Sequence, residues 1–230
     1  MLMLLQSFSR AVQLLLSGNR EVFFIAFTSL QLSSISILIS SLISLPLGVL
    51  LAFKDFSGRR VIIIILNTMM SLPTVVIGLL VYSLISRSGP LGGMGLLFSR
   101  GAIIIGQTLL SLPIIISLVY GAISRIDRRL PETLTTLGAH PGDIFIMTLK
   151  EGKTAILSAL LAGFGRVIGE VGVSMMLGGN IRWYTRTLTT AIALETSKGE
   201  FELALALGLI LLVISFAVNL ILHWLVKDER

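Results

Sequence analysis

The chain has no cysteine and few charged residues. Without cysteine it can form neither a disulfide nor a thiolate metal site. Charged side chains make up 13% of its 230 residues, against roughly 25% in soluble domains. A chain so poor in charge cannot cover a large water-exposed surface, so the composition indicates lipid as its surroundings.

Several function classes lack their usual residues. The two histidines, His140 and His223, lie too far apart in sequence to suggest a metal site. The net charge of +6 comes without a basic stripe interleaved with aromatics, which argues against nucleic-acid binding. No pair of catalytic carboxylates, histidine cluster or serine nucleophile motif supports an intramembrane enzyme. In a membrane protein, such a basic excess usually sets orientation.

Long apolar runs are abundant. Hydrophobic residues make up 54% of the chain, and its mean hydropathy is +0.96. A bilayer-spanning helix needs about 20 mostly apolar residues. The sequence therefore predicts an all-α integral membrane protein, a single domain over residues 1–230 with five transmembrane helices. The expected spans are residues 29–53, 61–86, 102–123, 154–177 and 203–226.

The first twenty residues do not resemble a cleaved signal, because Arg10 interrupts the apolar run and no basic residue precedes it. Leu4, Ala11 and Leu15 instead predict an N-terminal amphipathic helix lying in the membrane interface. With the N-terminus outside, ten Lys/Arg fall on the inner side and seven on the outer, Arg166 belonging to neither. This bias predicts that the loop 124–153 and the C-terminus are cytoplasmic.

A proline motif recurs within the predicted spans. "NTMMSLP" (67–73) and "QTLLSLP" (107–113) share a pattern, and "SLP" also occurs at 44–46. Proline removes a backbone hydrogen bond and kinks a helix, and neighbouring helices can satisfy the freed groups. The repeats indicate kinks that either serve packing alone or shape a pathway.

The stretch "LPETLTTLGAH" (130–140) predicts a short helix in the loop 124–153. Pro131 suits the first helical position, and Glu132 suits the first turn, where the helix dipole favours negative charge. Gly138 can adopt the left-handed conformation that ends a helix, and the His140-Pro141 step enforces the stop.

The same short helix carries an apolar stripe, formed by Leu130, Leu134 and Leu137. A second amphipathic helix follows in "GDIFIMTLKEGK" (142–153) and leads into the next span. Two short helices joined by a glycine suit docking into a groove of a soluble partner. The alternative is a simple interfacial loop.

Two charged residues, Arg166 and Glu170, interrupt the fourth predicted span. A central charge costs about 2.5–3.5 kcal/mol on insertion scales, and the i, i+4 spacing lets the two side chains pair. The sequence supports either a buried ion pair that fixes helix packing or a polar site beside a substrate path. Gly165 and Gly169 form a small face for close helix contact.

Beyond this span, Gly178-Gly179-Asn180 is expected to end the helix. The segment 181–200 is rich in threonine and carries Arg182 and Arg186, which are suitable donors for an oxyanion. The alternative is an interfacial re-entrant segment that places Trp183 and Tyr184 in the aromatic belt.

Glu132, followed after five residues by Gly138, resembles the coupling-loop signature of ABC importer permeases. Thr133 and Leu134 stand where that family prefers alanines, and "TLKE" (148–151) replaces its usual ending. The resemblance implies that the loop inserts into an ATP-binding subunit. Glu132, Leu134, Leu137 and Gly138 would then organise the contact with this ATPase.

ATP itself is not expected on this chain. "GKT" (152–154) lacks the glycine of a phosphate-binding loop, because Met147 occupies that position. No cofactor is therefore expected here, and ATP and Mg would be bound by the partner ATPase.

"GRVIGEVGVSMMLGGNI" (165–181) and "TRTLTTAIALETSKGE" (185–200) resemble permeases of oxyanion ABC importers, most of all the tungstate branch. The resemblance implies the type I importer permease fold in the cell inner membrane. It also implies a non-enzymatic homodimer with two ATPase subunits and an extracytoplasmic binding protein, working by alternating access.

Five residues are candidates for the translocation pathway or its gate: Arg166, Glu170, Asn180, Arg186 and Thr187. The alternatives are a molybdate or sulfate permease of the same family, or a proton-coupled secondary anion transporter that uses Glu170 as a proton relay.

Overall fold

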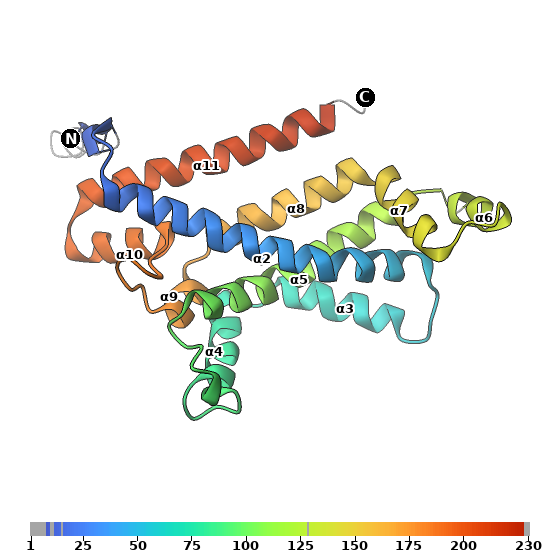
Figure 1. The fold of residues 1–230 in the computed structure, drawn as a ribbon, viewed down its shortest axis with the longest axis horizontal. Helices are drawn as coiled ribbons and strands as arrows, with labels where there is room; N and C mark the ends of the chain where they lie inside the picture. The colour runs from blue at the N-terminus through green and yellow to red at the C-terminus, as the bar shows by residue number, and fades with distance from the viewer. Residues whose placement is uncertain (1–7, 10–11, 15, 128, 228–230) are drawn as a thin grey trace.

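The structure is a computed structural model that describes residues 8–9, 12–14, 16–127 and 129–227 (Figure 1). The described residues form helices and no strand, which agrees with the predicted all-α class. Helices suit a membrane because they satisfy their own backbone hydrogen bonds. In chain order they are α2 (Arg20–Phe53), α3 (Arg59–Met70), α4 (Thr74–Ile85), the 3₁₀ turn η1 (Gly92–Met94), α5 (Arg100–Ile123), α6 (Arg129–Thr136), α7 (Pro141–Glu151), α8 (Lys153–Ile168), α9 (Gly172–Gly178), α10 (Leu188–Lys198) and α11 (Phe201–Lys227).

The core is built by α2, α5 and α8, which pack against one another. Asn19 and Ser99 begin α2 and α5, since their side chains accept hydrogen bonds from backbone N–H groups of the first turn. The largest buried apolar cluster comes from these three helices: Ile37, Val49, Ala52, Ile115, Val119, Ile123, Ile156, Ala159 and Val167. On the outside, α11 packs against α8 and α10.

Two of the expected spans are bent rather than continuous. The predicted span 61–86 is divided into α3 and α4, whose axes differ by 102°, and the predicted span 154–177 is divided into α8 and α9, which differ by 61°. Among the described residues, three helices are long and apolar enough to cross a membrane alone, namely α2, α5 and α11, and each bent pair could supply one more. The exact limits of the membrane segments remain predictions.

The recurring "SLP" motif has different outcomes at its three sites. Pro46 lies inside α2 and Pro113 inside α5, and both helices continue through their proline. Pro73, in contrast, is the residue at which α4 begins after the 102° bend. The physical reason is packing: α2 and α5 support each other along their length, whereas α3 buries no residue.

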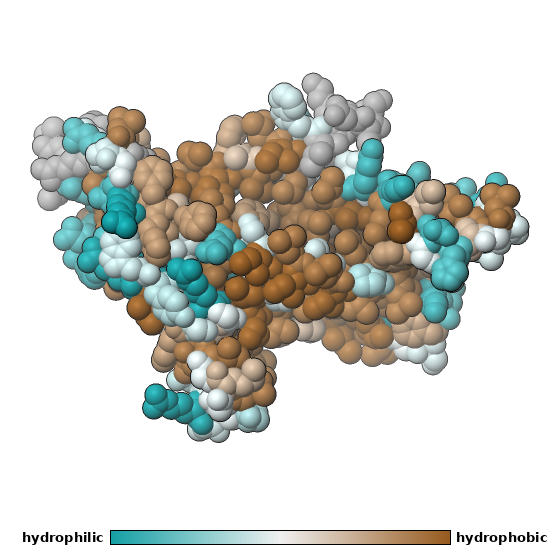
Figure 2. All heavy atoms as spheres, in the orientation of Figure 1, coloured by the Kyte–Doolittle hydropathy of each residue, from teal (hydrophilic) through white to brown (hydrophobic). Residues whose placement is uncertain are grey.

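The molecule has two polar ends and an apolar middle (Figures 1 and 2). The turn 54–58, α6 and α7 lie at one end, and α10 and the start of α2 lie at the other. Hydrophilic residues gather at these ends and at the tip beyond α4, while hydrophobic residues cover the surface between. The predicted interfacial helix depends on Leu4, Ala11 and Leu15, which lie outside the described residues.

Candidate functional site

The elbow between α6 and α7 adopts the conformation that the sequence predicts. Gly138 has φ +81°, and its N–H donates to the Thr135 carbonyl at 3.0 Å. The next N–H, of Ala139, donates to the Leu134 carbonyl at 2.9 Å. This pair of bonds is the Schellman motif, which satisfies the last carbonyls of a helix and requires a left-handed residue. The elbow therefore has a fixed geometry.

His140 begins α7 as a helix cap, a role that the sequence interpretation did not assign. Its Nδ1 accepts from the Gly142 N–H at 3.4 Å, and its own N–H donates to Asp143 Oδ2 at 3.2 Å. This reciprocal pairing follows the logic of a capping box. The signal was present in the sequence, because Asp143 follows His140 at the capping-box spacing.

The first of the two short helices, α6, is exposed. None of its residues is buried, and Glu132 lies on the surface. Of the predicted apolar stripe, Leu130 and Leu134 are half-buried, whereas the Leu137 side chain is 77% exposed. Helix α6 begins at Arg129, so Pro131 lies within its first turn rather than at its first residue. The described chain thus covers Leu130 and Leu134 in part and leaves Leu137 open.

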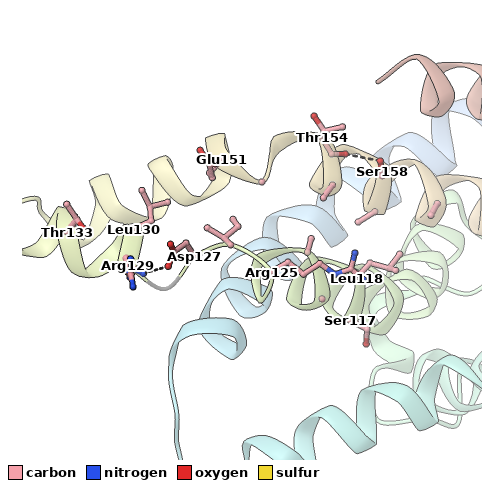
Figure 3. A pocket seen from close by; sticks show the side chains of 17 residues that line it. Ser117, Leu118, Arg125, Asp127, Arg129, Leu130, Thr133, Glu151, Thr154 and Ser158 are labelled. Atoms are coloured by element: carbon pink, nitrogen blue, oxygen red, sulfur yellow. Dashed lines mark hydrogen bonds between the residues drawn. The ribbon is translucent and has the colours of Figure 1, made fainter. Parts of the chain in front are cut away.

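A wide groove opens beside this elbow, between α5, α6 and α8 (Figure 3). Its volume is about 1100 Å³. Small side chains line much of it: Ser117, Gly121, Ala122, Ala155, Ser158, Ala159 and Ala162. Arg125, Asp127, Arg129 and Glu151 bring charge to its walls, so it is not a purely apolar, lipid-like surface.

Arg166 and Glu170 form the predicted ion pair, with Arg166 Nη1 at 2.8 Å from Glu170 Oε2. Glu170 lies beyond the end of α8, in the break before α9, where the Val173 N–H donates to its Oε1 at 3.2 Å. The two residues differ in burial, because Glu170 is 4% exposed while the Arg166 side chain is 43% exposed. Near Arg166, the exposed residues of α8 and of the break that follows it are small, namely Ala162, Gly165 and Gly169.

Hydroxyl groups connect Glu170 to the start of α10. Thr189 Oγ1 donates to the Glu170 carbonyl at 2.8 Å, and it lies 3.3 Å from Thr187 Oγ1. Thr187 caps α10 together with Thr190, whose carbonyl accepts from Asn180 Nδ2 at 3.3 Å. Four of the five predicted pathway residues, Arg166, Glu170, Asn180 and Thr187, thus belong to one chain of polar contacts.

Arg186, the fifth predicted residue, points to different partners. Its Nη1 lies 3.5 Å from Glu21 Oε1 and 3.6 Å from Glu195 Oε1. Arg182 also binds Glu21, through a 2.8 Å hydrogen bond from its Nε, and the Glu21 carboxylate raises the pKa of Arg182. This charged cluster joins the first turn of α2 to the segment before α10.

Sequence interpretation missed a row of hydroxyls on α2. Five serines at helical spacing on α2 are buried: Ser29, Ser33, Ser36, Ser40 and Ser44. Ser36 Oγ donates to Gln107 Oε1 at 3.1 Å, and Gln107 Nε2 donates to Ser174 Oγ at 3.4 Å. The 3- and 4-residue spacing of these serines was visible in the sequence.

Comparison with known proteins gives consistent results. Residues 44–230 match the family described as binding-protein-dependent transport system inner membrane component. The tungstate uptake system permease protein TupB of Campylobacter jejuni is 41% identical over 94% of this chain and 90% of that protein. The molybdenum transport system permease protein ModB of Haemophilus influenzae is 29% identical, over 84% of this chain and 91% of its own.

The fold has a counterpart among solved structures. A chain of the inward-facing MetNI methionine ABC transporter aligns with a TM-score of 0.70, covering 89% of this chain and 94% of that one. The two sequences are 19% identical, so this likeness concerns the fold alone. It agrees with the predicted type I importer permease fold.

Proposed function

Since the chain belongs to the family of binding-protein-dependent transport system inner membrane components, we propose that it is the permease subunit of an ATP-driven tungstate importer. Members of this family are transport subunits rather than enzymes. The observation that supports tungstate as the substrate is the 41% identity to a tungstate uptake permease over nearly the whole chain, against 29% identity to a molybdenum permease. Molybdate or sulfate is the alternative cargo.

The partners follow from this assignment. A permease that binds no ATP needs a separate ATPase subunit, which would hold ATP and Mg, and an extracytoplasmic protein that delivers the anion. We place two copies of this chain at the centre of the assembly. The loop 124–153 and the C-terminus would face the cytoplasm.

The elbow is the proposed contact with the ATPase. An exposed short helix with a partly uncovered leucine stripe matches helix-in-groove recognition. Leu134 and Leu137 would enter the groove of the ATPase, and Glu132 would contact its rim. Gly138 fixes the angle between α6 and α7. Closure of the ATPase on ATP would then move α6 and, through α7, the span that begins with α8.

The position of Arg166 supports a pathway for the anion along this side of α8. A half-exposed guanidinium within an apolar span is costly against lipid, so this side of α8 faces protein or water. The small residues around it leave room for a pathway between two copies of the chain. Arg166 would attract the anion, while Asn180, Arg186 and Thr187 would contribute to the gate near α10.

A proton relay through Glu170 is less well supported. A relay carboxylate must exchange its proton during each cycle, whereas the Glu170 carboxylate is engaged on both oxygens, by Arg166 and by the Val173 N–H. Such contacts favour a lasting structural role beside the pathway. Transport that stops when the proton gradient collapses, without any loss of cellular ATP, would reverse this conclusion.

The experiment is tungsten uptake, measured by mass spectrometry in cells that lack the gene and again after it is restored. We expect restoration by the wild type and a roughly tenfold loss with Glu132→Ala, because a coupling contact is typically worth that factor. Glu200→Ala, an exposed glutamate beyond α10, is the matched control and should transport normally.

The same assay, repeated with molybdate and sulfate, identifies which anion is transported. Restored molybdate or sulfate uptake, without tungstate uptake, would keep the importer and change its substrate. If no oxyanion responds to the gene, the assignment as an oxyanion importer is wrong.

A further inference from the structure

A small pocket lies beside the turn between α2 and α3, separate from both the elbow groove and the polar contacts of Glu170. Its volume is about 300 Å³, and its lining is mainly polar. The residues that line it are Ala52, Phe53, Arg59, Tyr120, Ile123, Ser124 and Ile126. The turn lies at the same end of the molecule as α6 and α7 (Figure 1), so the pocket belongs to a membrane-surface end of the bundle.

The Arg59 guanidinium is held in place at this pocket. Its Cζ lies 5.6 Å from the centre of the Tyr120 ring, its Nη1 contacts Asp55 Oδ1, and its Nη2 donates to the Ala52 carbonyl at 3.4 Å. The Nε, however, is buried and has no hydrogen-bond partner among the described residues. A buried donor without a partner is unusual in a folded protein and indicates a missing acceptor.

The charges around the pocket favour an anionic acceptor. Lys54 and Arg60 flank the turn and are exposed, and with Arg59 they outweigh the single acidic residue of the segment 54–60, Asp55. The Asp55 side chain is 71% exposed. An arriving anion can therefore take its place at Arg59 while the Asp55 carboxylate stays in contact with water.

We propose that this pocket binds a phosphate group, supplied by the headgroup of an anionic phospholipid, with Arg59 as its anchor. A guanidinium matches phosphate oxygens with paired hydrogen bonds. Tyr120 and Ser124 also line the pocket, and each carries a hydroxyl that can donate a hydrogen bond. Basic sites at this level of a membrane protein commonly hold lipid headgroups, and inorganic phosphate offers the same chemistry.

The test is lipid retention by the full-length protein. The purified chain would be incubated with phosphatidylglycerol or phosphatidylcholine, washed, and examined by native mass spectrometry. We expect one phosphatidylglycerol to stay bound to the wild type. Arg59→Gln should lower its affinity at least about tenfold, the effect of losing one charge-assisted contact. Arg60→Gln removes the same charge from the neighbouring exposed position but keeps the anchor, so it should lower the affinity much less than Arg59→Gln.

Arg59→Lys keeps the positive charge and therefore controls for loss of binding through misfolding. It should still bind phosphatidylglycerol more weakly than the wild type, because lysine lacks the planar guanidinium. Protection against thermal unfolding by inorganic phosphate alone, lost in Arg59→Gln, would support the phosphate site with a free ligand. Equal losses in the Arg59 and Arg60 variants, or equal retention of both lipids, would overturn the proposal. This site is independent of the cargo, because lipid retention does not require transport.

Discussion

At the scale of single residues, the Arg166–Glu170 pair is asymmetric. Glu170 is almost fully buried and depends on two partners, whereas Arg166 reaches a partly open surface. Removing one member of a buried pair is costly mainly because the other is left as an uncompensated charge. The cost should therefore depend on which residue remains.

Arg166→Ala should lower the free energy of unfolding by about 2 kcal/mol, because it strands the Glu170 carboxylate. Glu170→Gln should cost only about 1 kcal/mol, since glutamine still accepts from the Val173 N–H and Arg166 keeps access to the surface. Thermal unfolding in detergent measures both. The double variant should be more stable than the sum of the two losses implies, and simple additivity would contradict the pair.

Residue patterns predicted some of these contacts and not others. The i, i+4 spacing predicted the pairing of Arg166 with Glu170, and the glycine that follows the short amphipathic helix predicted the left-handed elbow at Gly138. The contact between Thr189 and the Glu170 carbonyl was not predictable, because it joins segments whose approach depends on the 61° bend between α8 and α9.

At the scale of elements, glycines decide how closely helices approach. Gly106 of α5 faces α9 so closely that an added Cβ would lie 2.4 Å from both Leu177 Cδ1 and Val173 Cγ1. Gly121, on the same helix, would have no atom within 4 Å of its Cβ. One helix thus contains a glycine that packing requires and one that it does not.

Gly106→Ala should destabilise the protein by about 1–3 kcal/mol, the usual cost of overpacking. Gly121→Ala should stabilise it by about 0.5–1 kcal/mol, because alanine favours a helix over glycine. Because the two predicted changes in stability have opposite signs, thermal unfolding of the two variants distinguishes them clearly. A similar loss at both sites would mean that the approach of α5 to α9 is not as close as described.

Hydropathy predicted the apolar segments but not their bends. The mean hydropathy over a sliding window treats 61–86 as one span, because the residues near Pro73 are still compatible with lipid. Whether a proline breaks the helix depended on neighbours: α2 and α5 pack together through Pro46 and Pro113, and α3 has no comparable support. That information lies in the tertiary contacts.

At the scale of the whole molecule, the two polar ends define the axis along which the chain is expected to cross the membrane. The turn 54–58, α6 and α7 form one end and α10 the other (Figure 1). The charge bias that places the first end in the cytoplasm is modest, ten basic residues against seven, so a direct test is useful. The natural absence of cysteine makes single-cysteine labelling straightforward.

Ser57→Cys and Ser197→Cys place one thiol at an exposed position of each end. In intact cells, a membrane-impermeant maleimide should label the Ser197→Cys variant, and should reach the Ser57→Cys variant only after permeabilisation. The cysteine-free parent is the control for background labelling. The reverse pattern would invert the proposed topology and place the elbow out of reach of a cytoplasmic ATPase.

The 102° bend has a consequence for the surrounding bilayer. The 12 residues of α3 extend about 18 Å, and the 34 residues of α2 about 51 Å, at 1.5 Å per residue. The hydrocarbon layer is about 30 Å thick. The full length of α2 exceeds that thickness while α3 alone falls short of it, so lipids around one subunit would meet hydrophobic mismatch of opposite sign on its different sides. The bilayer would therefore have to thin beside α3, whereas α2 would have to tilt to fit within it.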